Sequence, residues 1–231
     1  TFNDFVAIDE VKSISFTNDK EMGGILKGYM EDGYTTVGGT RVDGEAGIIF
    51  LGNIAVEDMD SSKNMLHDLP EIFSDSALLQ RIHGFIPGQF IPPLSPRMFI
   101  NGWALNTEYF TEIMHLLRSP AETMRYRGLV EELVEVTSKS GDTSGREQDS
   151  IMRLCTAYLK LFFPHADSLL IKDAAFRREF DKYCLTPAKR MQETVLKQMK
   201  IINPGMFGDK GFATYKVRQP QIIRENEMFG E

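Results

Sequence analysis

The sequence predicts an α/β fold, in which a parallel sheet with a β-hairpin is followed by an α-helical subdomain. Two apolar runs, Phe5–Ile8 and Ile48–Leu51, have the composition of strands buried on both faces of a parallel sheet. A helical pattern and a glycine-containing hairpin lie between them, and the sequence becomes helical after Pro92. The predicted parts are an α/β part (1–100), a helical part (101–202) and a linker or extension (203–231).

Local signals predict the elements of the first part. The first helix places Met22, Ile25, Leu26 and Tyr29 on one face and is stopped by Gly33. Two glycines in the middle of residues 34–42 predict a hairpin with a two-residue turn. The further elements predicted in this part are a helix at 61–72 and a third strand near 84–91.

Capping residues predict the helices of the second part. Asn106 and Ser119 are suited to cap helices that run to Arg118 and to about Ser138, and Ser144 is suited to cap a third helix that Pro164 stops. Residues 173–200 are predicted to supply further helix.

Two adjacent carboxylates, Asp9 and Glu10, follow the first apolar strand directly. The carboxyl end of a parallel strand is where such sheets bind ligands. The pattern is typical of a Walker B motif, in which Asp9 would hold Mg²⁺ through water and Glu10 would polarise the water that attacks a γ-phosphate. A buried strand followed by an acidic turn is the alternative for these residues alone.

Asn53 ends the second apolar strand, 43 residues after Glu10. If the two strands are neighbours, their ends lie about 5 Å apart, so the Asn53 amide can reach the same water or phosphate. This is a sensor-1 position, although an asparagine at a strand end also commonly forms a turn.

Three arginines are candidates for contact with a phosphate. Arg81 precedes the predicted third strand, where it could reach a neighbouring subunit as an arginine finger. Arg146 falls in the first turn of a helix, where the helix dipole disfavours positive charge unless an anion is near. Arg153 lies seven residues further along, on the same face, so the two could form a sensor-2 pair. Each arginine could instead make only a structural salt bridge.

Composition excludes several classes of protein. The chain has 26 basic and 33 acidic residues and no polybasic tract, so its total charge does not call for nucleic acid. No apolar stretch reaches the length of a membrane span, and no signal-peptide pattern is present. Cys155 and Cys184 do not form a metal-binding spacing, and we expect buried thiols in a reducing cytoplasm and no structural metal.

The order of these motifs resembles the AAA+ ATPases, and the hairpin before the sensor strand is similar to the pre-sensor insertion of the branch that holds MCM helicases. The segments 26–33, 50–54, 79–88 and 157–164 are similar to one family, the Lon-related BrxL proteins of BREX phage-defence systems. The resemblance implies a prokaryotic cytoplasmic ATPase that uses ATP and Mg²⁺, forms a ring and associates with DNA. In it, Arg41 of the hairpin would contact DNA. The resemblance also implies that 1–100 is the C-terminal half of an AAA+ α/β subdomain, with an incomplete parallel-sheet core, and that 101–202 is the helical lid subdomain.

Two departures limit what the resemblance implies. The chain contains no G-x-x-x-x-G-K-[ST] motif, so the phosphate cradle and its lysine are expected upstream of Thr1 in a longer parent protein. We therefore expect that this chain alone does not hydrolyse ATP. No motif pairs a nucleophilic serine with a lysine base, so a protease function rests only on the family label. A DNA-binding or scaffolding module without hydrolysis is the other alternative.

Overall fold

The computed structural model describes residues 5–137 and 145–219, which form two compact units. The first unit comprises Thr1–Met98, Ser144–Ser150 and Arg190–Phe212, and the second comprises the remaining ranges. Helices α5 and α7 contribute residues to both units. The predicted division into 1–100, 101–202 and 203–231 therefore differs from the compact units. Two ranges from later in the chain, Ser144–Ser150 and Arg190–Phe212, group with the α/β part, and the second of them includes the start of the predicted linker or extension.

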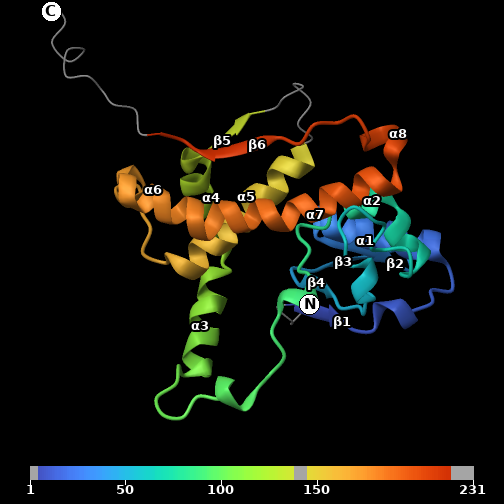
Figure 1. Cartoon of the computed structure of the whole chain (residues 1–231), viewed down its shortest axis with the longest axis horizontal. Coiled ribbons are helices and arrows are strands. Elements are labelled where there is room, and N and C mark those ends of the chain that lie inside the picture. The colour runs from blue at the N-terminus through green and yellow to red at the C-terminus, as the bar shows by residue number, and fades with distance from the viewer. Residues whose placement is uncertain (1–4, 138–144, 220–231) are drawn as a thin grey trace, which may run out of the picture. The chain divides into compact units, whose positions relative to one another are not determined.

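The first unit is built from a small parallel sheet, a hairpin and helices (Figure 1). Its strands are β1 (Phe5–Ile8), β2 (Tyr34–Val37), β3 (Thr40–Asp43) and β4 (Gly47–Phe50). Its helical segments are α1 (Asp19–Asp32), α2 (Ser76–Leu79), the first residues of α5 (Gly145–Phe162), most of α7 (Thr186–Ile202), and α8 (Pro204–Phe207).

The predicted pairing of the first two apolar strands is confirmed. Strands β1 and β4 are parallel, with Phe5 opposite Gly47 and Ile8 opposite Phe50. The expectation that both faces are buried is wrong for the described residues, because Phe5, Val6 and Ile49 are exposed. Of the residues described in these two strands, Ile8 and Phe50 pack against the apolar cluster formed around Val11, Ile72, Phe73 and Leu78.

The predicted first helix and hairpin are also confirmed. Helix α1 is capped by Asn18, whose side chain accepts a hydrogen bond from Glu21 N–H, and it ends at Gly33 in the left-handed region. Gly38 and Gly39 have φ of 57° and 81°, as a two-residue turn of the mirror-image type requires. Strands β2 and β3 pair antiparallel around this turn.

Two other predicted elements are wrong. Residues 61–69 form turns and bends instead of a helix, because the Asp60 and Asn64 side chains accept hydrogen bonds from the amides of Ser62 and Leu66. The last two residues of the predicted helix belong to a short 3-10 helix, Glu71–Ser74. Residues 84–91 form no strand, since the Phe85 amide donates to the carbonyl of Met191 on α7 instead of to a neighbouring strand.

The second unit is mainly helical, as predicted. Its helices are α3 (Thr107–Leu117), α4 (Pro120–Leu133), most of α5 and α6 (Ala174–Phe180), followed by a π-helical turn, Asp181–Leu185, and the start of α7. The Asn106 and Ser119 side chains cap α3 and α4 as expected. Ser144, the expected cap of α5, lies outside the described residues. The core of the unit includes Tyr126, Leu133, Leu159 and Phe180, each fully buried.

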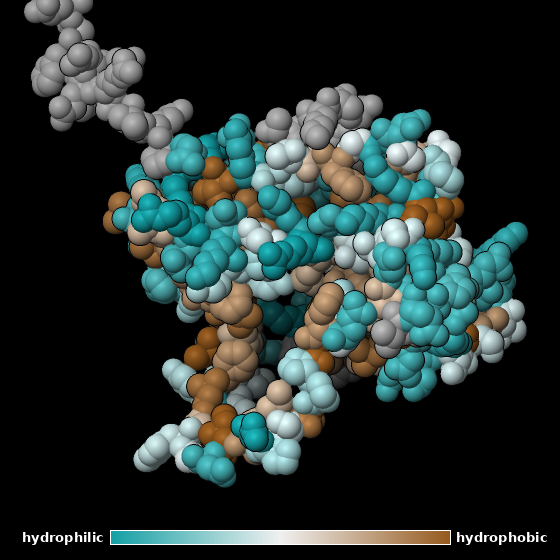
Figure 2. Space-filling view, viewed as in Figure 1, coloured by the Kyte–Doolittle hydropathy of each residue, from teal (hydrophilic) through white to brown (hydrophobic). Residues whose placement is uncertain are grey.

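An antiparallel pair of strands in this unit was not predicted. Strand β5 (Val134–Thr137) takes the place expected for the end of a helix, and it pairs with β6 (Thr214–Val217) in Figure 1. Residues 203–231, expected to be a linker or extension, thus contain both α8 and β6. Apolar residues gather over α3 in Figure 2, and Phe110 and Leu116 of this helix are exposed.

One side chain in the first unit fixes the turns at 61–65 to α7. Gln198 is 2% exposed, and its Oε1 accepts a hydrogen bond from Met65 N–H at 2.9 Å. Its Nε2 donates to the carbonyls of Lys63 at 2.9 Å and Ser61 at 3.4 Å. The segment that follows Asn53 is therefore held by a buried amide, in place of the helix that was predicted.

We expect Gln198→Leu to lower the free energy of unfolding by at least about 2 kcal/mol, because it leaves buried backbone groups unpaired. Equilibrium urea unfolding measures the effect. Gln192→Leu is the matched control: Gln192 lies on the same helix and is equally buried, but its Oε1 has no hydrogen-bond partner within the described residues. A loss of stability as large in the control as in Gln198→Leu would contradict this assignment.

Candidate functional site

The turn after β1 holds the two predicted catalytic carboxylates at the surface of the first unit. Asp9 and Glu10 are both exposed, and Asp9 Oδ1 accepts a hydrogen bond from Glu10 N–H at 2.8 Å. The next residue, Val11, is 2% exposed and anchors the turn in the core. One buried residue thus fixes a turn whose two acidic side chains face solvent.

Glu10 has an unusual backbone conformation. Its φ of 51° and ψ of 43° lie in the left-handed region, and among the described residues it is the only non-glycine residue with positive φ. Such a conformation costs about 1–3 kcal/mol and persists where the surroundings enforce it. Here the Glu10 carbonyl accepts from Ser13 N–H at 2.7 Å, and the Val11 amide is also bonded. The strain therefore falls on the residue that the sequence predicts to be catalytic.

Backbone hydrogen bonds join this turn to the end of β4. Leu51 N–H donates to the Ile8 carbonyl at 2.9 Å, and Val11 N–H donates to the Leu51 carbonyl at 3.0 Å. The two chains thus continue side by side beyond the strands, and Asn53 follows Leu51 by two residues, exposed, at the same end of the sheet as Glu10. The structure brings Asp9, Glu10 and Asn53 to one edge, as the sequence predicted.

The chemistry of these side chains fits a hydrated Mg²⁺ ion. Mg²⁺ prefers oxygen ligands and keeps several waters, and Asp9 has a second carboxylate oxygen besides the one that accepts from Glu10. Among the described residues, no three histidine, cysteine, aspartate or glutamate side chains cluster as ligands for a metal ion.

Arg81 is held within its own unit. Its side chain is only 13% exposed, Nη1 donates to the Ala77 carbonyl at 2.5 Å, and Nη2 is bonded to the Glu31 carboxylate. Its Nε is buried with no hydrogen-bond partner in the described part of the chain. These contacts show which groups position Arg81, and its role as an arginine finger stays a prediction.

Arg146 lies in the first turn of α5, as predicted, and its anion is Glu31. Arg146 Nη2 lies 2.6 Å from Glu31 Oε1, and Arg146 Nη1 donates to Gln80 Oε1 at 3.2 Å. Arg146 and Arg81 hold the pKa of the Glu31 carboxyl below its usual value, Arg146 having the larger effect. Two arginines predicted separately are thus joined by one carboxylate.

The remaining two predicted arginines are exposed. Arg153 lies on α5 in the second unit, whereas Arg146 belongs to the first, so their predicted pairing stays a prediction. Arg41 on β3 is bonded to Asp43 at 2.7 Å, and its guanidinium stacks 4.0 Å from the centre of the Tyr34 ring. Asp43 raises the pKa of Arg41 and neutralises part of its charge.

The two cysteines are buried, unpaired thiols, as expected. Burial raises the pKa of both groups, that of Cys184 to about 12, so neither is a reactive thiolate at neutral pH. No helix among the described residues is long and apolar enough to cross a membrane.

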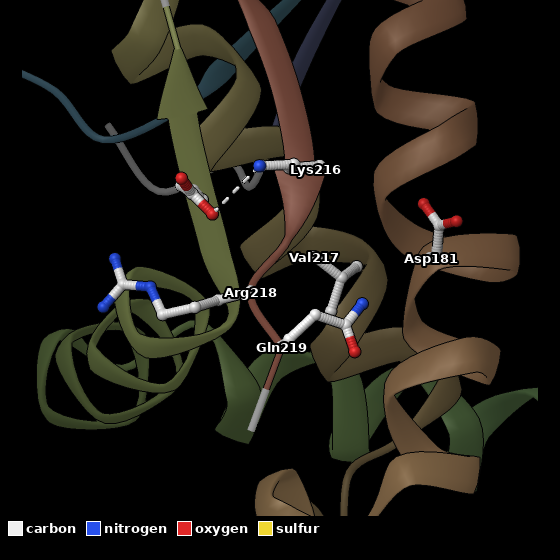
Figure 3. A pocket seen from close by; sticks show the side chains of 6 residues that line it. Asp181, Lys216, Val217, Arg218 and Gln219 are labelled. Atoms are coloured by element: carbon white, nitrogen blue, oxygen red, sulfur yellow. Dashed lines mark ion pairs between the residues drawn. The ribbon is translucent and has the colours of Figure 1, made fainter. Parts of the chain in front are cut away.

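The second unit has a shallow pocket beside β6 (Figure 3). Glu135 and Lys216 form an ion pair of 3.5 Å across β5 and β6, while Asp181 lies on the neighbouring helix and Arg218 points away from Asp181. Two of the charged side chains that line the pocket therefore pair with each other across the sheet, and Arg218 does not approach Asp181.

Sequence reasoning missed Glu31. A signal for it was present: Glu31 lies in the last turn of α1, where the helix dipole disfavours negative charge. A carboxylate there and an arginine at the start of another helix are each unfavourable alone and suggest a pair.

Comparison with known proteins identifies the family. Residues 1–213 match the family described as "Lon-like protease BrxL-like, ATPase domain". The chain is 31% identical over 212 residues to the Lon-like protease BrxL of Escherichia coli O9:H4 (strain HS), and 28% identical over 213 residues to that of Bacillus cereus (strain H3081.97). These matches cover 91% of this chain, and the chain spans only 28–29% of the length of those relatives. The chain therefore belongs to the family of BrxL-like ATPase domains.

Proposed function

We propose that this chain is the catalytic second half and helical lid of an AAA+ ATPase motor that uses ATP and Mg²⁺. The observation that carries the proposal is the parallel pairing of β1 and β4, which brings Asp9 and Glu10 to the same sheet edge as Asn53. Mg²⁺ bound there would neutralise charge on the transferred phosphate. Asp9 would hold the metal-bound water, Glu10 would orient and polarise the attacking water, and Asn53 would hydrogen-bond that water or the phosphate.

The proposal extends to the assembled protein. In it, subunits would form a ring around DNA in a prokaryotic cytoplasm, as part of BREX phage defence. Arg81 would reach the nucleotide of a neighbouring subunit, and Arg146 and Arg153 would sense it. The presence of two adjacent carboxylates at the strand end favours hydrolysis over the alternative of a scaffold that only binds DNA.

The experiment that tests the proposal compares this chain with the full-length protein. We expect Mg²⁺-dependent release of phosphate from ATP by the full-length protein and none by the purified 231-residue chain, because the chain contains no phosphate-binding loop motif. Turnover by the isolated chain, abolished by Glu10→Gln, would contradict the need for an upstream cradle. ATP binding without turnover by the full-length protein would favour the scaffold.

The β2–β3 hairpin is proposed to face the ring channel and to contact DNA through Arg41. We expect Arg41→Glu in the assembled protein to weaken binding of duplex DNA and to reduce its dependence on salt, because each phosphate contact releases counterions. Titration of a labelled duplex at several salt concentrations measures both.

A second substitution, at Asp43, is expected to change DNA binding in the direction opposite to Arg41→Glu. Asp43 neutralises Arg41 at 2.7 Å, so Asp43→Asn should strengthen binding and steepen its salt dependence. An exposed hairpin without a DNA contact is the alternative. Unchanged affinity and salt slope in both variants, in rings that still hydrolyse ATP, would remove the hairpin from the DNA path.

A further inference from the structure

Three side chains distant in sequence meet in the first unit. Glu31 comes from the last turn of α1, Arg81 follows α2, and Arg146 comes from the first turn of α5. Each oxygen of the Glu31 carboxylate binds one arginine: Oε1 lies 2.6 Å from Arg146 Nη2, and Oε2 is bonded to Arg81 Nη2. The carboxylate thus bridges the two guanidinium groups.

The ion pair between Glu31 and Arg146 joins two charges that each lie at the unfavourable end of a helix dipole. Glu31 places a negative charge at the carboxyl end of α1, and Arg146 places a positive charge at the amino end of α5. Each position is unfavourable by about 0.3–1 kcal/mol when taken alone. Contact between the two charges relieves both effects, so the pair explains two placements that neither helix explains by itself.

The charges also define what the group can bind. Two guanidinium groups so close together repel each other, and the Glu31 carboxylate offsets that repulsion. The three side chains together keep a net charge of +1, so they still attract an anion. The Arg81 side chain is only 13% exposed and its Nη1 also donates to the Ala77 carbonyl, so its guanidinium is held in place by the surroundings.

We infer that Glu31 is a positioning residue that fixes Arg81 and Arg146 as a pair, so that both act on one phosphate group of ATP in the assembled protein. The inference rests on the proposed ATPase function. Glu31 itself contacts neither nucleotide nor metal in this proposal. It acts by setting the place and orientation of the two cations before the phosphate arrives, which lowers the cost of ordering them during the reaction.

The test is Glu31→Gln in the full-length protein, with steady-state ATP hydrolysis as the first readout. Glutamine keeps the size of the side chain and removes the charge. We expect kcat to fall about tenfold or more while KM for ATP changes less than about twofold, because alignment acts mainly in the transition state. Glu31→Asp, which keeps the charge, should recover part of kcat. Asp32→Asn is the matched control, since it removes a charge from the neighbouring residue, and it should leave kcat unchanged.

The second readout follows the pairing directly. Phenylglyoxal modifies accessible arginines, and mass spectrometry reports the rate at Arg146. We expect Glu31→Gln to speed modification of Arg146 at least about threefold, because the ion pair shields a side chain that is 47% exposed. Asp32→Asn should not change this rate.

The outcomes separate the two proposals. An unchanged or increased kcat in Glu31→Gln would overturn the positioning role while leaving ATPase function intact. An unchanged modification rate at Arg146 would overturn the pairing. A lower unfolding temperature with wild-type kcat would show that Glu31 only stabilises the fold. If the wild-type protein hydrolyses no ATP but Arg146 is deprotected in Glu31→Gln, the proposed function fails and the pairing stands.

Discussion

Glu10→Gln in the full-length protein is expected to keep ATP binding and to lose hydrolysis by at least about 10²-fold. General-base contributions are of this size, and the amide can still hydrogen-bond water but cannot polarise it. The variant keeps the size of the side chain at the strand end. Binding of a fluorescent ATP analogue and release of phosphate measure the two properties separately. Loss of both together would mean that Glu10 has a structural role.

The left-handed conformation of Glu10 allows a sharper version of this test. Glycine adopts positive φ without the strain that glutamate has there, so Glu10→Gly should also abolish hydrolysis while leaving stability equal or higher. Glu71→Gln, at another exposed position of the same unit, is the control and should retain activity. Lower stability in Glu10→Gly would contradict the view that the site is strained.

Arg81→Ala is expected to reduce hydrolysis by the assembled protein about 10³-fold or more, the range measured for arginine fingers. If Arg81 acts on the nucleotide of a neighbouring subunit, mixing Arg81→Ala subunits with Glu10→Gln subunits should restore part of the activity. Mixed rings would contain interfaces with both residues intact. Titration of one variant into the other, with phosphate release as readout, measures the recovery.

The contacts of Arg81 require a control for folding. Because it is largely buried and bonded to Glu31 and Ala77, its removal also costs stability. Arg81→Lys keeps the charge but not the two-pronged geometry, so it should fold better and remain slow. Mixed rings that form without any recovery of turnover would end the assignment of Arg81 as a finger.

Much of the fold was predictable where the signal is local. Gly33, Gly38 and Gly39 determine the hairpin through positive φ, and Asn106 and Ser119 cap their helices with their own side chains. The errors involve distant partners. Val134 and Val136 continue the apolar pattern of α4, but they pair with β6, about 80 residues later in the sequence. Turns at 61–65 depend on Gln198, which no local pattern reveals.

The candidate site, too, was predictable where the signal is local and not where it depends on distant partners. Asp9, Glu10 and Asn53 were predictable because strand ends in a parallel sheet share an edge, and the pairing of β1 with β4 puts them there. The anion beside Arg146 was expected as a phosphate, whereas the structure supplies Glu31 from a helix 115 residues away in sequence. Sequence periodicity places side chains on faces, but it does not determine which faces meet.

Gly33 separates the hairpin from the last turn of α1, and the backbone can rotate at this residue. The Gly33 amide donates to the Tyr29 carbonyl and its own carbonyl accepts from Gly44 N–H, so the base of the hairpin is fastened to the helix end. Glu31 lies only two residues before this point. Because Glu31 lies so close to Gly33, a movement of the hairpin relative to α1 can displace the carboxylate that holds Arg81 and Arg146, unless rotation about the Gly33 backbone absorbs it. The freedom of backbone rotation at this one glycine thus affects how far a movement of the hairpin displaces Arg81 and Arg146.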